Sequence, residues 1–199
     1  MMSPLSEEQF KQIRDNRIEQ ILGVGLRIFA RKGYIGTKLS TIASEAGISK
    51  GLLYHYYKSK DEFLETLIHR AIQELESGIQ EMYQTPATPL EKFKNMLDFK
   101  EEEQYYFLLI HQVLLSEEVP DKLKNIAKEH FLGTELFDKL VPLFKEGQEL
   151  GEFAPGDPNK IVTSFLTVQS GLMALNLIND EKFIKPDPDI LIRMLTGRP

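Results

Sequence analysis

Cysteine is absent from all 199 positions of the chain. This absence excludes a disulfide framework and any metal site built on thiolate ligands, and it is compatible with a reducing compartment. Residues 1–10 also lack the basic start and the apolar run that mark a secretory signal. We therefore expect a cytoplasmic protein.

Long apolar runs are lacking as well. The least polar stretch, residues 161–179, carries no formal charge, but threonine, serine, glutamine and asparagine recur along it. A helix that spans a membrane would not tolerate so many polar side chains. We predict instead a helix buried on more than one side, and no membrane association.

Alternation of apolar and polar residues, the pattern of a half-buried strand, is missing, and neither an internal repeat nor a low-complexity tract is present. Apolar residues recur instead at steps of three and four almost throughout, which predicts an all-α protein. Helices are expected from Ser6 to Gly33, from Lys38 to Ala46, from Lys50 to Tyr57 and from Lys60 to Met82, with further starts at Thr88, near Pro120, at Asp157 and at Asp187.

Two glycines interrupt the first of these helices. Gly23 and Gly25 each cost roughly 1 kcal/mol relative to alanine in a helix interior. Either they let another part of the chain approach closely, or they are simply tolerated. The sequence leaves both interpretations open.

Positive charge is scarce outside the N-terminal part. Residues 1–60 hold 10 Lys and Arg against 5 Asp and Glu, whereas residues 61–199 hold 14 against 25. A basic head on an acidic body indicates that only the head meets a polyanion. Chance scatter of charge between the two parts would give the same counts, so this feature alone does not decide for nucleic acid.

The segment from Lys38 to Tyr57 fits a helix-turn-helix. Two short helices that cross closely need small residues at the contact, which Ala43 and Ala46 supply, and the turn needs a residue that tolerates positive φ, which Gly47 supplies. Thr37 and Ser49 are the expected N-caps of the two helices. The residues expected to face the small core are Ile48, Leu53 and Tyr57.

The outward side of the third helix is the predicted DNA-reading surface, because the second helix of such a motif enters the major groove. Its basic residues can bond base edges or phosphates, its tyrosines can donate to phosphates, and a glycine permits close approach. The alternative, that the turn and the aromatic residues serve packing alone, stays open. The predicted contacts are Ser49, Lys50, Gly51, Leu52, Tyr54, His55 and Tyr56, followed by Lys58 and Lys60 as a clamp on a flanking phosphate.

These residues carry a family resemblance. The stretch G-Y-I-G-T-K-L-S-T-I-A-S-E-A-G-I-S-K-G-L-L-Y-H-Y-Y-K-S-K-D-E-F-L, Gly33 to Leu64, closely resembles the DNA-binding domain of TetR-type (tetracycline-repressor-like) transcriptional regulators. The match extends over about residues 12–64 without a gap. By position, the resemblance adds Thr37 and Ser40 to the DNA contacts.

The resemblance implies a homodimer with an N-terminal three-helix DNA-binding domain, residues 1–58, and a C-terminal helical domain for regulation and dimerisation, residues 59–199. Such a protein is expected to repress transcription by binding palindromic operator DNA. In the family the last two long helices, here about Pro158–Asn179 and Pro188–Leu195, build the dimer. The expected interface residues are Ser170, Gly171, Ala174, Ile190 and Met194.

The family's C-terminal body encloses a small-molecule pocket, so we expect a largely apolar effector that releases the DNA. Aromatic residues crowd the middle helices, and most of them must be ordinary core. The candidate ligand contacts are Phe93, Met96, Tyr106, Phe107, His111, Phe131, Phe137 and Asn176. No cofactor and no metal are expected.

Two other functions compete with this interpretation. A small helical enzyme is disfavoured, because no nucleophile arrangement or phosphate-cradling glycine loop is found and the histidines lack a paired metal-ligand spacing. A DNA-bound scaffold whose body binds a protein partner would expose an apolar patch rather than enclose a cavity. The sequence does not separate this scaffold from a ligand-responsive regulator.

Overall fold

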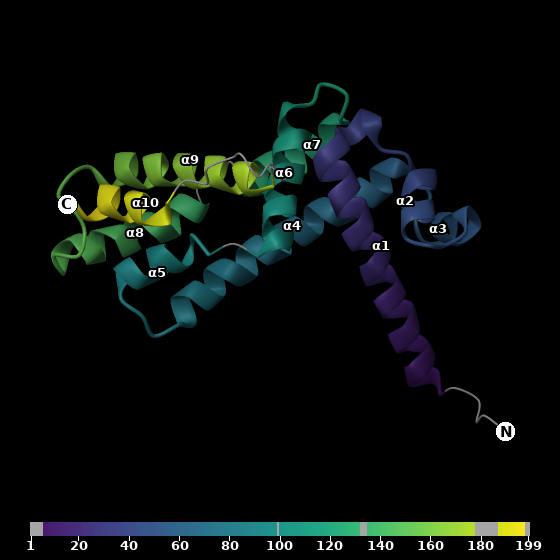
Figure 1. The fold of residues 1–199 in the computed structure, drawn as a ribbon, viewed down its shortest axis with the longest axis horizontal. Coiled ribbons are helices and arrows are strands. Elements are labelled where there is room, and N and C mark those ends of the chain that lie inside the picture. The colour runs from purple at the N-terminus through teal and green to yellow at the C-terminus, as the bar shows by residue number, and fades with distance from the viewer. Residues whose placement is uncertain (1–5, 99, 132–134, 178–186, 198–199) are drawn as a thin grey trace.

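The computed structural model describes residues 6–98, 100–131, 135–177 and 187–197, and all regular secondary structure in these ranges is helical, which confirms the all-α prediction (Figure 1). The helices are α1 (Glu7–Gly36), α2 (Leu39–Glu45), α3 (Lys50–Tyr56), α4 (Lys60–Gln84), α5 (Pro89–Asn95), α6 (Glu101–Leu115), α7 (Asp121–Phe131), α8 (Glu135–Glu149), α9 (Pro158–Asn176) and α10 (Pro188–Thr196).

The helices form two groups that α4 connects (Figure 1). The short helices α2 and α3 lie at one end beside α1, and α5, α8, α9 and α10 lie at the other end. Helices α6 and α7 occupy the middle, and the N-terminal part of α1 projects away from the rest. No helix in the described ranges is both long enough and apolar enough to cross a membrane.

Local side-chain caps account for several helix starts. A capping box begins α1 at the predicted start, since Ser6 and Gln9 each bond the backbone N–H of the other. Gly33, the predicted end of this helix, interrupts its helical conformation with φ 66°, and α1 continues to Gly36. At α4, two polar residues could have formed a capping box by their spacing, but only Ser59 caps the helix, because the carboxylate of Glu62 accepts from the backbone N–H of Lys58.

The first hydrophobic core joins the head to the middle of the molecule. Buried apolar residues of α1, α2, α3 and α4 continue without interruption into those of α6 and α7. The core therefore crosses the expected division between residues 58 and 59. Residues on both sides of the division share one packed interior, so the two ranges are not separate packing units. Their different roles stay a prediction.

The second core lies at the opposite end, among α5, α8, α9 and α10, and four phenylalanines form its centre. The ring of Phe93 meets those of Phe144, Phe153 and Phe165 edge-on, with centroids 5.2 to 5.8 Å apart. Gly147 makes room for this packing, because a Cβ there would lie 2.3 Å from the Phe153 ring.

Candidate nucleic-acid interface

Helices α2 and α3 pack as the sequence predicts. Ala43 and Ala46 are buried at their contact, and Gly47 makes the turn with φ 65°. The N–H of Ile48 donates to the carbonyl of Ala43 at 3.0 Å and holds the reversal of the chain. Of the three residues predicted for the small core, Leu53 and Tyr57 are buried and Ile48 is half-buried against it.

The apolar side of α3 fixes which of its residues reach the surface. Ser49 caps the helix, its hydroxyl accepting from the N–H of Leu52 at 3.2 Å. Tyr56 is half-buried, and its ring meets the ring of His55 edge-on at 5.7 Å. The predicted contacts with exposed positions are Ser49, Lys50, Gly51, Leu52, Tyr54 and His55.

Thr37 does not belong to this surface. Its side chain is only 1% exposed, and its hydroxyl donates to the carbonyl of Gly33 at 2.7 Å. The N-cap of α2 is Lys38, which makes no side-chain cap bond. The prediction that Thr37 caps α2 is therefore wrong, and burial keeps its side chain from reaching DNA. Ser40, the other contact predicted on α2, is half-buried.

The two lysines after α3 are held by backbone carbonyls. The ammonium of Lys58 lies 3.3 Å from the carbonyl of Tyr54 and 3.4 Å from that of His55, at the C-terminal end of α3. Lys60 is half-buried and donates to the carbonyl of Tyr34 at 3.0 Å, with its nitrogen 3.8 Å from the centre of the Tyr34 ring. A phosphate contact by either lysine remains a prediction.

Tyr34 also ties the head to α4 through a second bond. Its hydroxyl donates to a carboxylate oxygen of Asp61. Burial, this hydrogen bond and the negative charge of Asp61 raise the pKa of Tyr34 to about 12. The hydroxyl therefore stays protonated at neutral pH and remains a donor, so Tyr34 and its two partners link the end of α1 to the start of α4.

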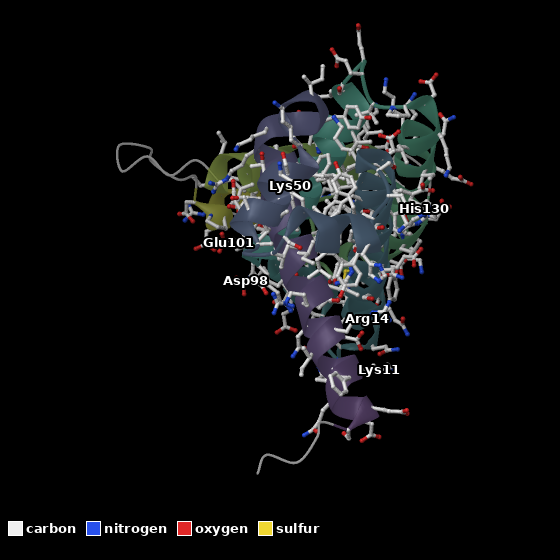
Figure 2. All side chains as sticks on the ribbon, turned by 90° about the vertical axis from the view of Figure 1, so that its right-hand side faces the viewer. Lys11, Arg14, Lys50, Asp98, Glu101 and His130 are labelled. Carbon is white, nitrogen blue, oxygen red and sulfur yellow. The ribbon has the colours of Figure 1, made fainter. Side chains whose placement is uncertain are left out.

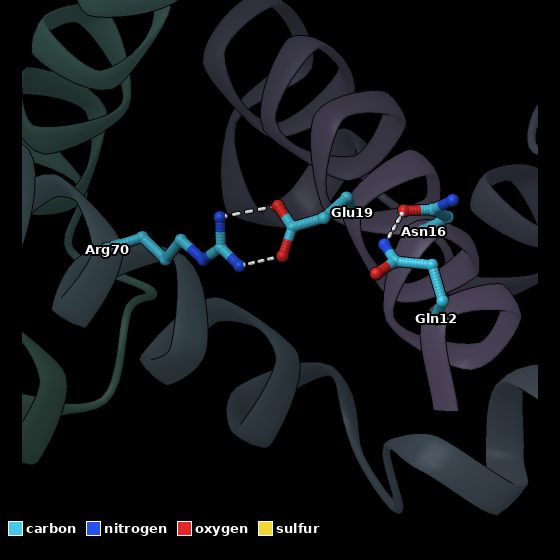
Figure 3. A network of polar contacts seen from close by, with 4 residues as sticks. All are labelled: Gln12, Asn16, Glu19 and Arg70. Atoms are coloured by element: carbon cyan, nitrogen blue, oxygen red, sulfur yellow. Dashed lines mark hydrogen bonds and ion pairs between the residues drawn. The ribbon is translucent and has the colours of Figure 1, made fainter. Parts of the chain in front are cut away.

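The polar contacts of the first half of α1 were not predicted from the sequence. Arg70 of α4 makes a bidentate ion pair with Glu19, and further toward the N-terminus the amide of Gln12 donates to Asn16 at 2.8 Å (Figure 3). The guanidinium of Arg14 lies 6.0 Å from the centre of the Tyr56 ring of α3. A row of basic residues on this part of α1 could have been found in the sequence, because Lys11 and Arg17 flank Arg14 at intervals of three residues.

The residues predicted for a dimer interface lie on α9 and α10. Ile190 and Met194 are 56% and 57% exposed, and with Gly171 they line a hollow of about 310 Å³ between the two helices. Val168, whose spacing predicts the core face of α9, is 38% exposed and lines the same hollow. The other two predicted residues, Ser170 and Ala174, are half-buried.

Helix α9 corrects one expectation for residues 161–179. It is buried on one side only, where Val162, Phe165 and Leu172 pack, while its other side exposes Thr163 and Thr167. Both threonine hydroxyls donate to the carbonyl four residues earlier, which lowers the cost of placing them on an uncharged helix. The predicted end of this helix, Asn179, lies outside the described residues.

The candidate ligand contacts divide between the two cores rather than surrounding one site. Tyr106 and Phe131 pack in or against the first core. Burial and the nearby carboxylate of Glu102 raise the pKa of Tyr106 to about 12. Phe107 and His111 sit side by side on α6, with ring centroids 4.0 Å apart. Phe93, Met96 and Phe137 belong to the second core, and the side chain of Asn176 lies outside the described part of the structure.

Side chains that could ligate a metal ion are scattered over the described residues. No group of three or more His, Asp or Glu side chains there could hold a metal ion.

The region that holds α2 and α3 matches a known protein family. The family model for bacterial regulatory proteins of the tetR family matches residues 21–67. The chain is 28% identical to a protein named HTH-type transcriptional repressor KstR2, from Mycolicibacterium smegmatis, over 156 residues that cover 76% of this chain and 74% of that protein.

Two solved structures share the fold over nearly the whole chain. The MbdR regulator from Azoarcus sp. CIB superimposes with a TM-score of 0.75 at 21% identity, covering 92% of this chain and 99% of that chain. AibR, solved in complex with isovaleryl coenzyme A and operator DNA, gives a TM-score of 0.64 at 20% identity and covers 90% of this chain and 98% of that one.

Proposed function

We propose that this chain, which belongs to the TetR family of transcriptional regulators, is a repressor that binds palindromic operator DNA as a homodimer and releases it when a small, largely apolar effector binds. The observation that carries the proposal is the exposed side of α3. It presents Lys50, Tyr54 and His55 outward from a helix whose opposite side is fixed in the first core, within the segment that matches the family. The protein acts in the cytoplasm and has no catalytic step.

The side chains of this surface suit two kinds of contact. Lys50 and His55 can bond base edges in the major groove, whereas Tyr54 and the lysines after α3 can bond phosphates. Leu52 adds an exposed apolar side chain for the methyl group of thymine. Base contacts would select the sequence, and phosphate contacts would set the position of the helix.

The exposed apolar side of α9 and α10 supports the proposed dimer. An apolar surface of this kind on two adjacent helices favours contact with another helix pair, and a second copy supplies one by symmetry. A twofold dimer would place two copies of α3 on the two halves of a palindrome.

Release by an effector is supported by the way α4 is packed. Its N-terminal half buries Phe63, Leu64 and Leu67 in the same core as α3, and this core continues into α6 and α7. A ligand that entered among α4, α6 and α7 would shift α4 and thereby change the separation of the two copies of α3 in the dimer. AibR was solved with both isovaleryl coenzyme A and DNA, and the isovaleryl group of this molecule is small and apolar, so isovaleryl coenzyme A is a suitable first probe.

Affinity selection from random duplexes tests the DNA-binding part of the proposal. The full-length protein is mixed with a pool of random duplexes, the bound fraction is sequenced, and the procedure is repeated with the double variant Lys50→Ala, His55→Ala. We expect a palindromic motif for the unaltered protein and a lost or altered motif for the variant. A featureless bound pool would contradict the proposal.

The recovered duplex then serves to test release. Titration with isovaleryl coenzyme A is expected to lower DNA binding if an acyl group is the effector. Sedimentation of the same complex gives the number of chains per duplex, which we expect to be two or a multiple of two.

A further inference from the structure

The first three turns of α1 project from the molecule, and only Arg14 among their residues lies over a ring of another helix, that of Tyr56. Every residue from 7 to 17 is exposed, and burial in the first core begins only near Ile18 and Ile21. At about 1.5 Å of rise per residue, this segment extends about 16 Å beyond the core. Tertiary packing adds almost nothing to the stability of this projecting helix, so its presence needs another explanation.

The sequence stabilises this segment as a helix by local means. The capping box of Ser6 and Gln9 satisfies backbone N–H groups at its start, Glu7 and Glu8 occupy the first turn, and Gln12 bonds Asn16 one turn on. Carboxylates at a helix N-terminus interact favourably with the helix dipole. The segment therefore has the local signals that a helix needs when no neighbour supports it.

Charge is divided between two sides of the projecting segment. Lys11, Arg14 and Arg17 recur every three residues and so lie on neighbouring positions of the helix surface. Glu8, Asp15 and Glu19 fall on another side at steps of seven and four, and Glu19 there is bound to Arg70 of α4 (Figure 3). Glu7 in the first turn is the one carboxylate of this segment that shares the basic side.

At Arg14 the basic side of α1 meets the end of α3. Arg14 lies over the ring of Tyr56, the residue that ends α3. Figure 2 looks onto the α3 end of the molecule and shows Lys50 of α3 in front, with Arg14 and then Lys11 further along the projecting part of α1. A duplex that received α3 in its major groove would continue past these side chains.

We propose that the basic side of α1, formed by Lys11, Arg14 and Arg17, lies along backbone phosphates of the DNA that flanks the half-site contacted by α3. Phosphates follow one another about every 3.4 Å of helix axis on each strand, so a segment of about 16 Å can reach several of them. The inference rests on the proposed function, since it needs α3 to dock on a duplex. It enlarges the DNA contact of each subunit by a surface outside the helix-turn-helix.

The test compares two variants that lose the same charge. The first replaces Lys11, Arg14 and Arg17 by Gln, which keeps helix propensity and removes three cations from the projecting helix. The matched control replaces three exposed lysines of α5 and α8 by Gln: Lys94, Lys139 and Lys145. Binding to the selected duplex is measured over a range of salt concentrations, and circular dichroism verifies that all three proteins are equally folded.

We expect the α1 variant to bind every duplex more weakly and with a weaker dependence on salt. The slope of log K against log salt should become shallower by about 0.9 for each phosphate that is no longer neutralised, hence by more than about 2 if all three side chains bind phosphates. The control variant should keep the slope of the unaltered protein. Equal slopes for the α1 variant and the control would overturn the inference.

Shortening the duplex outside the two half-sites provides an independent test of the same inference. Removal of the flanks should lower the affinity of the unaltered protein for the duplex by the same factor as the α1 substitutions do. It should leave the affinity of the α1 variant unchanged. If the α1 variant instead changed the number of chains in solution, the projecting helix would contact a second copy of the chain, and the DNA assignment would be wrong. Failure of the unaltered protein to select any duplex would contradict the proposed function itself, and so differs from all of these outcomes.

Discussion

Gly23 and Gly25 stand two positions apart in α1, yet their surroundings differ completely. A Cβ on Gly25 would lie 2.3 Å from the ring of Phe63, whereas a Cβ on Gly23 would meet nothing within 4 Å. The Phe63 ring cannot move aside easily, because it is fully buried and packs on the rings of Phe29 and Tyr57. Of the two interpretations open from the sequence, close approach therefore applies to Gly25 and tolerance to Gly23.

Replacing these glycines with alanine should shift stability in opposite directions. Gly25→Ala is expected to lower the free energy of unfolding by about 1 to 3 kcal/mol, because overpacking strains the core around Phe63. Gly23→Ala should raise it by up to about 1 kcal/mol through helix propensity. Urea unfolding of both variants checks this pair. Equal changes in the free energy of unfolding would contradict the expectation that a Cβ at position 25 strains the packing around Phe63.

His55 carries a prediction about sequence choice. His55→Ala should change which duplexes are selected more than it lowers overall affinity, because a side chain that reads a base edge discriminates among bases, whereas one that bonds a phosphate does not. The selected pools of the two proteins are sequenced side by side. A uniform loss of affinity across all duplexes would make His55 a phosphate contact instead.

At the scale of the helix, Ser49 combines two predicted roles, since it caps α3 and lies beside Lys50 on the exposed surface. Ser49→Ala should lower the free energy of unfolding by about 1 kcal/mol because the cap is removed. Ser49→Asp should keep the cap and the stability but weaken DNA binding, because its carboxylate would face phosphates. Thermal unfolding and duplex binding separate the two effects, and unchanged binding by the aspartate variant would place Ser49 away from the DNA.

Short-range signals explain which elements were predictable from the sequence. The caps at Ser6, Ser49 and Thr88 and the turn at Gly47 depend on residues within a few positions of each other, and all were predicted correctly. The cap predicted at Thr37 was wrong because the partner of its hydroxyl, the carbonyl of Gly33, is available only where that glycine interrupts the helical conformation of α1.

Side-chain placement between distant helices was harder to predict. Val168 fits a core stripe by spacing alone, and only the position of α10 shows that it lines a surface hollow. The aromatic residues of the middle helices likewise looked like one group, because the sequence does not show that α6 packs in the first core while α5 and α8 build the second. The relative positions of helices, rather than their own patterns, decided these cases.

For the whole molecule, the proposed binding to a palindrome depends on a dimer formed through α9 and α10. The double variant Ile190→Asp, Met194→Asp should sediment as a monomer and bind the selected duplex much more weakly, because charge would enter the apolar surface around the hollow. Leu115→Asp is the control, since Leu115 is also exposed but lies on α6. A dimeric double variant would show that the subunits meet elsewhere.

Chemical interference on the selected duplex tests most directly whether α3 of each subunit enters the major groove. Methylation of guanine N7, which lies in the major groove, is compared with methylation of adenine N3 in the minor groove. Entry of one α3 from each subunit predicts two clusters of interfering guanines, related by the twofold axis and spaced by about 10 base pairs or a multiple of that. A single cluster, or interference confined to the minor groove, would contradict it.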